Sequence, residues 1–195
     1  MREFKVIGVM SGTSLDGIDI VYVNFKLEKY WKYELINSKT YRYENKWISL
    51  LQNISKEKSH SIRIIDADYT KLLSKYIIDF INEFSITNID FVSSHGHTAI
   101  HLPSNFITYQ IGNLPILAKY INQKVICDFR VQDVELGGQG APLVPVGEEY
   151  LFPEYNTLIN LGGFANITKR IKNNIIAYDI CPINIVFNHL SRMVE

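Results

Sequence analysis

The order of extended and helical segments is the feature that most constrains the fold of this chain. Three strand-like segments open it, at residues 4–10, 18–25 and roughly 31–43, and connections this short make neighbouring strands antiparallel. A long segment from Ser61 to Phe84 follows, in which apolar residues recur at every third or fourth position, as in an amphipathic helix. Shorter strand and helix patterns then alternate. The expected fold class is therefore α/β, an antiparallel meander continued by parallel α/β units.

The alternating segments after the long helix can be predicted one by one. "NIDFVSSHG" is typical of a buried strand that ends at Gly96, and "TYQIG" of a shorter strand. "LPILAKYINQ" indicates a helix with Pro115 near its first turn. "KVICDF" is apolar on both faces, which predicts a parallel strand covered by helices.

A change in composition divides the chain. Around "GGQGAPLVPVGEEYLFPEY" Gly and Pro accumulate, which indicates a hinge or a crossover. Beyond it, "NTLINLGGFANITKR" and "NNIIAYDI" predict strand, Gly-rich turn, strand and strand, as at the start of the chain. We expect residues 1–150 to form a first domain and residues 151–195 to begin a second unit of similar design.

The connection within "GVMSGTSLDGID" is too long and too rich in glycine and hydroxyls for a simple hairpin turn. Such a loop can bind phosphate, because glycine lets backbone N–H groups point inward and lets a ligand approach closely. It lacks the lysine of a Walker A motif and the second glycine of a nucleophile elbow. An elaborate hairpin is the alternative. The later Gly162-Gly163 turn favours phosphate, because two such turns can bind one polyphosphate from both sides.

Three histidines lie close together in "SSHGHTAIH": His95, His97 and His101. Such a cluster at a strand end can bind a metal, with Asp128 as the candidate fourth ligand. Alternatively, the imidazoles hydrogen-bond the loop backbone or contact a polar substrate at the mouth of a cleft.

Charged residues follow the strand predicted at residues 124–129. Ligands of open α/β sheets gather beyond the carboxyl ends of the strands, where Asp128, Arg130 and Asp133 are expected. Arg130 could pair with Asp128 as a structural contact, or bind a substrate carboxylate or phosphate through two hydrogen bonds.

Asp179 in "YDICPIN" is expected just past a strand. A carboxylate at that place, facing a phosphate loop, suits a general base that takes a proton from an attacking hydroxyl or water. It could equally be the N-cap of a closing helix at residues 183–194.

The composition excludes several classes of function. With 20 basic and 20 acidic residues and a hydrophobic fraction of 47%, the chain resembles soluble globular proteins and lacks the basic surface of a nucleic-acid binder. No apolar stretch reaches the roughly 18 residues that span a bilayer, and the N-terminus lacks the pattern of a signal peptide. The two cysteines, Cys127 and Cys181, have no metal-like spacing, so a reducing cytoplasm is the expected compartment.

Six motifs, taken together, resemble those of the anhydro-N-acetylmuramic acid kinase family. They are "IGVMSGTSLDGIDI", "SSHGHTAIH", "TYQIGN", "VICDFRVQDVELGGQGAPLVP", "NLGGFANIT" and "YDICPIN". The resemblance covers the whole chain, but members of the family are about twice as long. The chain therefore corresponds to their N-terminal half.

The resemblance implies the fold of sugar kinases, heat-shock proteins and actin, in which two ribonuclease H-like domains close around ATP. Residues 1–150 would be the first of these domains, with residues 151–195 starting the second. The implied reaction is the ATP-dependent phosphorylation of 1,6-anhydro-N-acetylmuramic acid, with water opening the anhydro ring. The product, N-acetylmuramic acid 6-phosphate, belongs to the recycling of cell-wall peptidoglycan.

The resemblance also implies roles for individual residues. Asp179 would be the base that activates the ring-opening water, and Arg130, His95 and His97 would help to bind the sugar. The implied nucleotide and metal are ATP and Mg²⁺, with Mg²⁺ near Asp16 or Asp19. The residues matched to the two phosphate loops are Gly12, Thr13, Ser14, Asp16, Gly17 and Asp19 in the first and Gly162 and Gly163 in the second.

Two motifs depart from the commoner family pattern. The family's motif at the base is Asp-Thr-Gly-Pro-Gly-Asn, whereas this chain has Asp179-Ile180-Cys181-Pro182-Ile183-Asn184. The base is kept, but two glycines are lost, which must change the local backbone. The family's motif "HGQT" is replaced in this chain by "HGHT", with His97 in place of glutamine. Both side chains can form hydrogen bonds.

We expect negligible kinase activity from this chain alone, because these kinases position and clamp the reactants with two domains. The expected partners are the amino sugar and ATP, and either a second copy of the chain or a chain that supplies the C-terminal half. A non-catalytic sugar-binding or assembly module is the alternative, and a His-based metallohydrolase is a third hypothesis.

Overall fold

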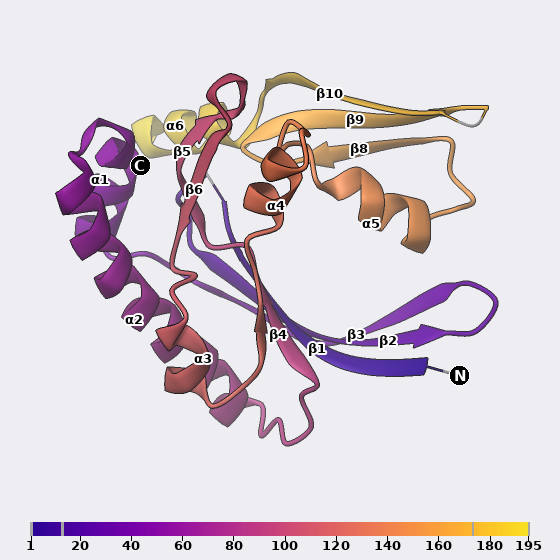
Figure 1. The fold of residues 1–195 in the computed structure, drawn as a ribbon, viewed down its shortest axis with the longest axis horizontal. Coiled ribbons are helices and arrows are strands. Elements are labelled where there is room, and N and C mark those ends of the chain that lie inside the picture. Colours follow the sequence, from indigo (N-terminus) through magenta and orange to yellow (C-terminus); the bar gives the residue numbers. More distant parts are fainter. Residues whose placement is uncertain (1, 13, 173, 195) are drawn as a thin grey trace.

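A mixed five-stranded sheet forms the centre of the computed structural model, which describes residues 2–12, 14–172 and 174–194 (Figure 1). Its strand order is β3 (Trp31–Tyr41), β2 (Ile18–Leu27), β1 (Arg2–Ser11), β4 (Phe91–Ser94) and β7 (Val125–Ile126). The first three strands are antiparallel, whereas β4 is parallel to β1 and β7 to β4. The predicted meander with parallel additions is confirmed, and with it the α/β class.

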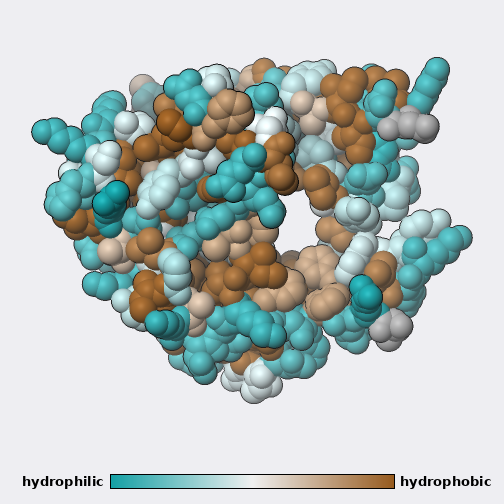
Figure 2. All heavy atoms as spheres, in the orientation of Figure 1, coloured by the Kyte–Doolittle hydropathy of each residue, from teal (hydrophilic) through white to brown (hydrophobic). Residues whose placement is uncertain are grey.

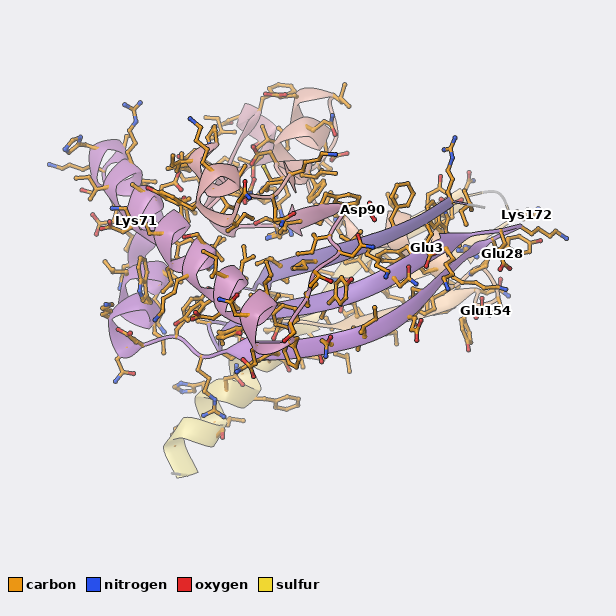
Figure 3. The ribbon with its side chains drawn as sticks, turned by 90° about the horizontal axis from the view of Figure 1, so that it is seen from below. Glu3, Glu28, Lys71, Asp90, Glu154 and Lys172 are labelled. Atoms are coloured by element: carbon orange, nitrogen blue, oxygen red, sulfur yellow. The ribbon has the colours of Figure 1, made fainter. Side chains whose placement is uncertain are left out.

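One face of this sheet is covered by helices. The helix α2 (Ser59–Glu83) lies across the sheet, flanked by α1 (Asn45–Asn53), the 3-10 turn Ile54–Lys56 and α3 (Ile116–Ile121) (Figures 1 and 3). Its completely buried side chains, Leu73, Ile77 and Phe80 among them, pack against the apolar face of β1, β2 and β4. Burial of each such side chain contributes about 1.5–3 kcal/mol. The helix predicted from Ser61 onward is confirmed.

Several elements are missing from the sequence-based prediction. β5 (His97–Leu102) and β6 (Ile107–Ile111) form a separate antiparallel hairpin, of which only the second strand was predicted. The short helices α1, α4 (Phe129–Glu135) and α5 (Val144–Leu151) were not predicted either. Helices of two turns carry too few apolar repeats for a periodic pattern to stand out.

A second, three-stranded antiparallel sheet follows in the order β10 (Asn174–Pro182), β9 (Phe164–Ile171) and β8 (Thr157–Leu161). The chain ends with α6 (Asn184–Val194), close to the predicted closing helix. The β2–β3 and β9–β10 hairpins reach the same end of the molecule, where Figure 3 labels Glu28 and Lys172. The predicted strand, Gly-rich turn, strand, strand order is confirmed.

An apolar trough lies on the other face of the five-stranded sheet. Its volume is about 590 Å³, and Figure 2 shows its opening with apolar side chains around it. The trough is lined by aromatic and aliphatic side chains of the sheet and of α5, including Phe4, Val23, Phe25, Trp31, Tyr150 and Leu151. Further large apolar side chains are exposed on the second sheet and α6: Ile159, Leu161, Tyr178, Phe187 and Leu190.

Within the described ranges, no helix combines the length and the apolar character needed to cross a lipid bilayer.

Candidate active site

The first glycine-rich loop connects the end of β1 to the start of β2 and is held at two points. Leu15 has a positive φ of 57°, which is unusual for a bulky side chain, and its side chain is buried. Its N–H donates to the Gly12 carbonyl at 3.5 Å. A Cβ on Gly17 would lie 2.6 Å from the Tyr41 carbonyl oxygen, so close packing against β3 requires glycine there. Thr13 lies outside the described residues.

Two carboxylates accompany this loop but have separate partners. Asp16 accepts a hydrogen bond from the Ser14 hydroxyl at 2.7 Å. Asp19, in β2, accepts one from the Thr40 hydroxyl of the neighbouring strand at 2.5 Å. Both carboxylates belong to exposed residues. They suit Mg²⁺, which is usually bound by one or two carboxylates together with water and phosphate oxygens.

The Gly162-Gly163 turn is tied to the start of α6. The backbone N–H groups of residues 183–185 donate to the carbonyls of Gly162 and Gly163 at 2.9–3.5 Å. One turn further along α6, the Asn188 amide donates to the Ser14 carbonyl at 3.5 Å. The two glycine-rich turns, far apart in the sequence, therefore meet through the first half of α6.

Asp179 lies inside β10 rather than after it. It is paired with Asn166 of β9, at an irregularity of the ladder between Asp179 and Cys181, and its residue is exposed. The N-cap interpretation is wrong, because α6 begins only at Asn184. A strand with an irregularity can redirect a side chain, as is common beside active sites.

Arg130 is held from two sides in the first turn of α4. Its Nε donates to His95 Nε2 at 2.8 Å, and its Nη1 donates to the Gly140 carbonyl at 2.6 Å. Burial lowers the pKa of Arg130, and the negative charge of Asp179 opposes this shift. The charge of Asp179, in β10, therefore acts on the guanidinium of Arg130, in α4.

The Arg130–Asp128 pair, one of the two alternatives for this arginine, does not form between these two described residues. Asp128 instead accepts a hydrogen bond from the Asn113 amide at 3.3 Å. The same amide donates to the His95 carbonyl at 3.3 Å, and the Asn113 oxygen accepts from Ser94 at 2.8 Å. Asn113 was missed as a site residue, although it closes the motif "TYQIGN".

The three clustered histidines do not share a metal site. The His95 ring donates from Nδ1 to the Gly96 carbonyl at 2.8 Å, while its Nε2 accepts from Arg130. His101 contacts the Thr108 hydroxyl at 3.2 Å. Across residues 2–12, 14–172 and 174–194, no group of three or more His, Cys, Asp or Glu side chains is arranged to bind a metal. The three-histidine interpretation with Asp128 is therefore wrong.

His97 starts β5 and is buried, with an exposed fraction of 3%. Its Nδ1 lies 3.2 Å from the Ser11 hydroxyl, at the end of β1. Burial, with a smaller effect of His95, lowers the pKa of His97 to about 4, and burial also lowers the pKa of His95. Both imidazoles are therefore neutral at pH 7, and they present hydrogen-bonding nitrogens rather than charges.

Sequence reasoning missed the hydroxyl groups beneath His97. Ser11, Tyr43 and Tyr69 are buried and mutually hydrogen-bonded there. Tyr69 carries the apolar periodicity of α2 and Tyr43 follows β3, so both looked like ordinary core residues. No local pattern distinguishes a buried tyrosine that uses its hydroxyl from one that only packs.

Comparison with known proteins identifies relatives along almost the whole chain. The sequence model of the family described as "Anhydro-N-acetylmuramic acid kinase" matches residues 4–193. A protein of that name from Bacillus cereus (strain ATCC 10987 / NRS 248) is 36% identical over 95% of this chain and 53% of its own length. One from Clostridioides difficile (strain 630) is 36% identical over 93% of this chain and 52% of its own length. The chain spans about half the length of the curated relatives it matches.

Proposed function

Because the chain belongs to the anhydro-N-acetylmuramic acid kinase family, we propose that it carries the sugar site and the first phosphate loop of an ATP-dependent sugar kinase. The substrate would be 1,6-anhydro-N-acetylmuramic acid and the product N-acetylmuramic acid 6-phosphate, in the cytoplasm. The observation that carries the proposal is that the negative charge of Asp179, in β10 of the second sheet, acts on the guanidinium of Arg130, in α4.

Asp179 is the proposed base. Its carboxylate takes a proton from water while the water oxygen forms a bond to C1 of the sugar. The C1–O6 bond breaks, its electron pair remains on O6, and O6 receives the γ-phosphoryl group of ATP, with ADP leaving. Arg130 is suited to hold a sugar oxygen or carboxylate, because His95 and the Gly140 carbonyl fix its guanidinium by two hydrogen bonds.

The phosphates are proposed to lie between the two glycine-rich turns. Gly12, Ser14 and Asp16 form the outer part of a loop whose inner part is anchored at Leu15 and Gly17. This geometry supports phosphate binding, because the backbone there is held in place and can be approached closely. Mg²⁺ bound near Asp16 or Asp19 would neutralise phosphate charge. Thr13 and the Gly162-Gly163 turn would complete the site.

The rest of the kinase corresponds to the C-terminal half of the relatives. Residues 1–150 would be a first ribonuclease H-like domain, which the strand order β3-β2-β1-β4-β7 supports, and residues 151–195 would begin a second. The relatives' additional half would cover the apolar trough and the exposed apolar side chains of the second sheet, in the same chain or from a partner chain. Isolated residues 1–195 would then have negligible kinase activity.

Titration calorimetry tests the sugar site on the chain as it is. We expect 1,6-anhydro-N-acetylmuramic acid to bind and Arg130→Gln to weaken this binding at least tenfold, since a charge-assisted hydrogen bond is lost. Arg2→Gln, at the start of β1 and at the opposite end of that strand from the loop, is the matched control and should bind like the wild type. No sugar binding by the wild type would overturn the proposed site.

Adding the C-terminal half of the Bacillus cereus relative tests whether kinase turnover requires both halves. We expect kinase turnover only in the mixture or in a fused chain. Turnover by residues 1–195 alone at about 1–100 per second, as is typical of kinases, would refute the proposed need for a second half.

A non-catalytic sugar-binding module is the second candidate. The observation that favours it is that the contacts around Arg130 and His95 are complete within the chain, whereas the second sheet is largely exposed. Sugar binding without Mg-ATP binding, and no turnover after the C-terminal half is added, would support this candidate over the kinase.

A further inference from the structure

Three buried hydroxyl groups form a closed ring beneath the first loop. The Ser11 Oγ lies 2.6 Å from the Tyr43 hydroxyl and 2.7 Å from the Tyr69 hydroxyl, and the two tyrosine oxygens are 2.5 Å apart. The exposed fractions of these residues are 2%, 7% and 0%, so water does not compete for the ring. The ring links the end of β1, the segment after β3 and the middle of α2.

The protons of the ring can be counted. Three hydroxyl groups carry three protons, and each of the three oxygen–oxygen contacts needs one of them. All three protons are therefore used within the ring, whichever way round they point. The fourth contact of the cluster joins Ser11 Oγ to His97 Nδ1 at 3.2 Å, and its proton has to come from the imidazole.

We infer that the Ser11–Tyr43–Tyr69 ring holds His97 as the tautomer protonated at Nδ1, which leaves Nε2 as a hydrogen-bond acceptor for a substrate N–H or O–H. The substrate class rests on the proposed function, in which His97 belongs to the sugar site. Ser11, Tyr43 and Tyr69 are then positioning residues that act through His97.

The surroundings of His97 support this assignment. Burial keeps the imidazole of His97 neutral at pH 7, since it lowers the pKa of His97 to about 4. The ring of Tyr69 packs edge-on against the imidazole, with 6.2 Å between centroids, which restricts its orientation. Among the described residues, the His97 side chain hydrogen-bonds through Nδ1 to Ser11, and its Nε2 has no partner. A glutamine at this position would offer both a donor and an acceptor, whereas this histidine offers an acceptor only.

The same ring connects the sugar side to the phosphate side. Ser11 directly precedes Gly12 of the first loop, and His97 follows His95 by two residues. A displacement of the loop backbone therefore changes the hydrogen bond that orients His97. The sequence motifs around residues 12 and 97 meet at this one hydroxyl.

Nitrogen-15 NMR of the histidine-labelled chain at pH 7 reads the tautomer directly, without any ligand. We expect His97 in the wild type to be protonated at Nδ1. Tyr69→Phe leaves two hydroxyl protons for one oxygen–oxygen contact, so Ser11 can donate to Nδ1 and the Nε2-protonated form should become measurably populated. Tyr43→Phe should act in the same way, which provides a second variant if one of them fails to fold.

The matched control is Tyr22→Phe, since Tyr22 is also a buried tyrosine but its hydroxyl donates to the Asn88 carbonyl at 2.6 Å, away from the hydroxyl ring. It should keep the wild-type tautomer. The inference is overturned if wild-type His97 carries its proton on Nε2, or if both ring variants keep the pure Nδ1 form.

Addition of 1,6-anhydro-N-acetylmuramic acid tests the acceptor role. The Nε2 resonance should shift on binding, and Tyr69→Phe should weaken binding about tenfold. A sugar that binds without moving this resonance would refute the acceptor role. A complete lack of sugar binding would instead count against the proposed function, while the ligand-free spectrum still decides the tautomer.

Discussion

The buried His97 makes the stability of the fold depend on pH in a calculable way. Its pKa is lowered from the ordinary value of 6.5 to about 4, first by burial and then by the neighbouring His95. In the unfolded chain the imidazole takes up a proton near pH 6.5, whereas in the folded chain it does so only near pH 4. The stability that neutral His97 contributes is therefore complete above about pH 6.5 and declines as the pH falls towards 4.

The size of this effect follows from the two pKa values. Each pKa unit corresponds to about 1.4 kcal/mol, so the shift from 6.5 to about 4 amounts to about 3 kcal/mol. This is a large part of the roughly 5–15 kcal/mol by which a domain is stable. His97→Gln removes the titrating group, so the free energy of unfolding of the wild type should fall by about 3 kcal/mol more than that of the variant between about pH 7 and pH 4.

Urea denaturation of both proteins at a series of pH values measures this difference. His95 and all carboxylates are present in both proteins, so their own contributions largely cancel. His60→Gln, an exposed histidine at the start of α2, is the control and should follow the wild-type profile. Parallel profiles for the wild type and His97→Gln would refute the burial of a neutral His97.

Three further outcomes are expected. Gly17→Ala should destabilise the chain by about 1–3 kcal/mol in urea denaturation, because the new methyl group would collide with a β3 carbonyl. Gly147→Ala in α5 is the control: its methyl group would have no atom within 4 Å and should stabilise the chain by up to about 1 kcal/mol. Phe80→Ala should cost about 3–5 kcal/mol in the same measurement, and a loss under 1 kcal/mol would contradict its place in the core. Burial and a neighbouring carboxylate raise the pKa of Cys127 to about 11. Iodoacetamide at about pH 8 should therefore modify the exposed Cys181 before Cys127, as mass spectrometry of the products would show, and equal rates of modification would contradict this environment of Cys127.

Local sequence patterns were sufficient to predict the helices and strands that are long or in which apolar and polar residues alternate regularly. The α2 helix extends over 25 residues, and its apolar repeat can be read without any knowledge of its neighbours. The strands β1 and β2 are ten residues long, and each contains an alternating or largely apolar run. By contrast, β5 was not recognised, because its sequence His97–Leu102 mixes two histidines with apolar residues and was interpreted as a polar loop after the strand that ends at Gly96.

The sequence by itself determined the α/β class, the two glycine-rich turns and the family, because these depend on neighbouring residues and on motifs in a set order. Only the tertiary structure decided which side chains meet. Arg130 contacts His95, 35 positions away, rather than Asp128, two positions away. Likewise, the hydroxyl ring joins residues 11, 43 and 69 and extends to residue 97. The physical reason is that such contacts depend on how a helix lies on a sheet, and burial then selects the partner of each polar group because an unpaired one is costly.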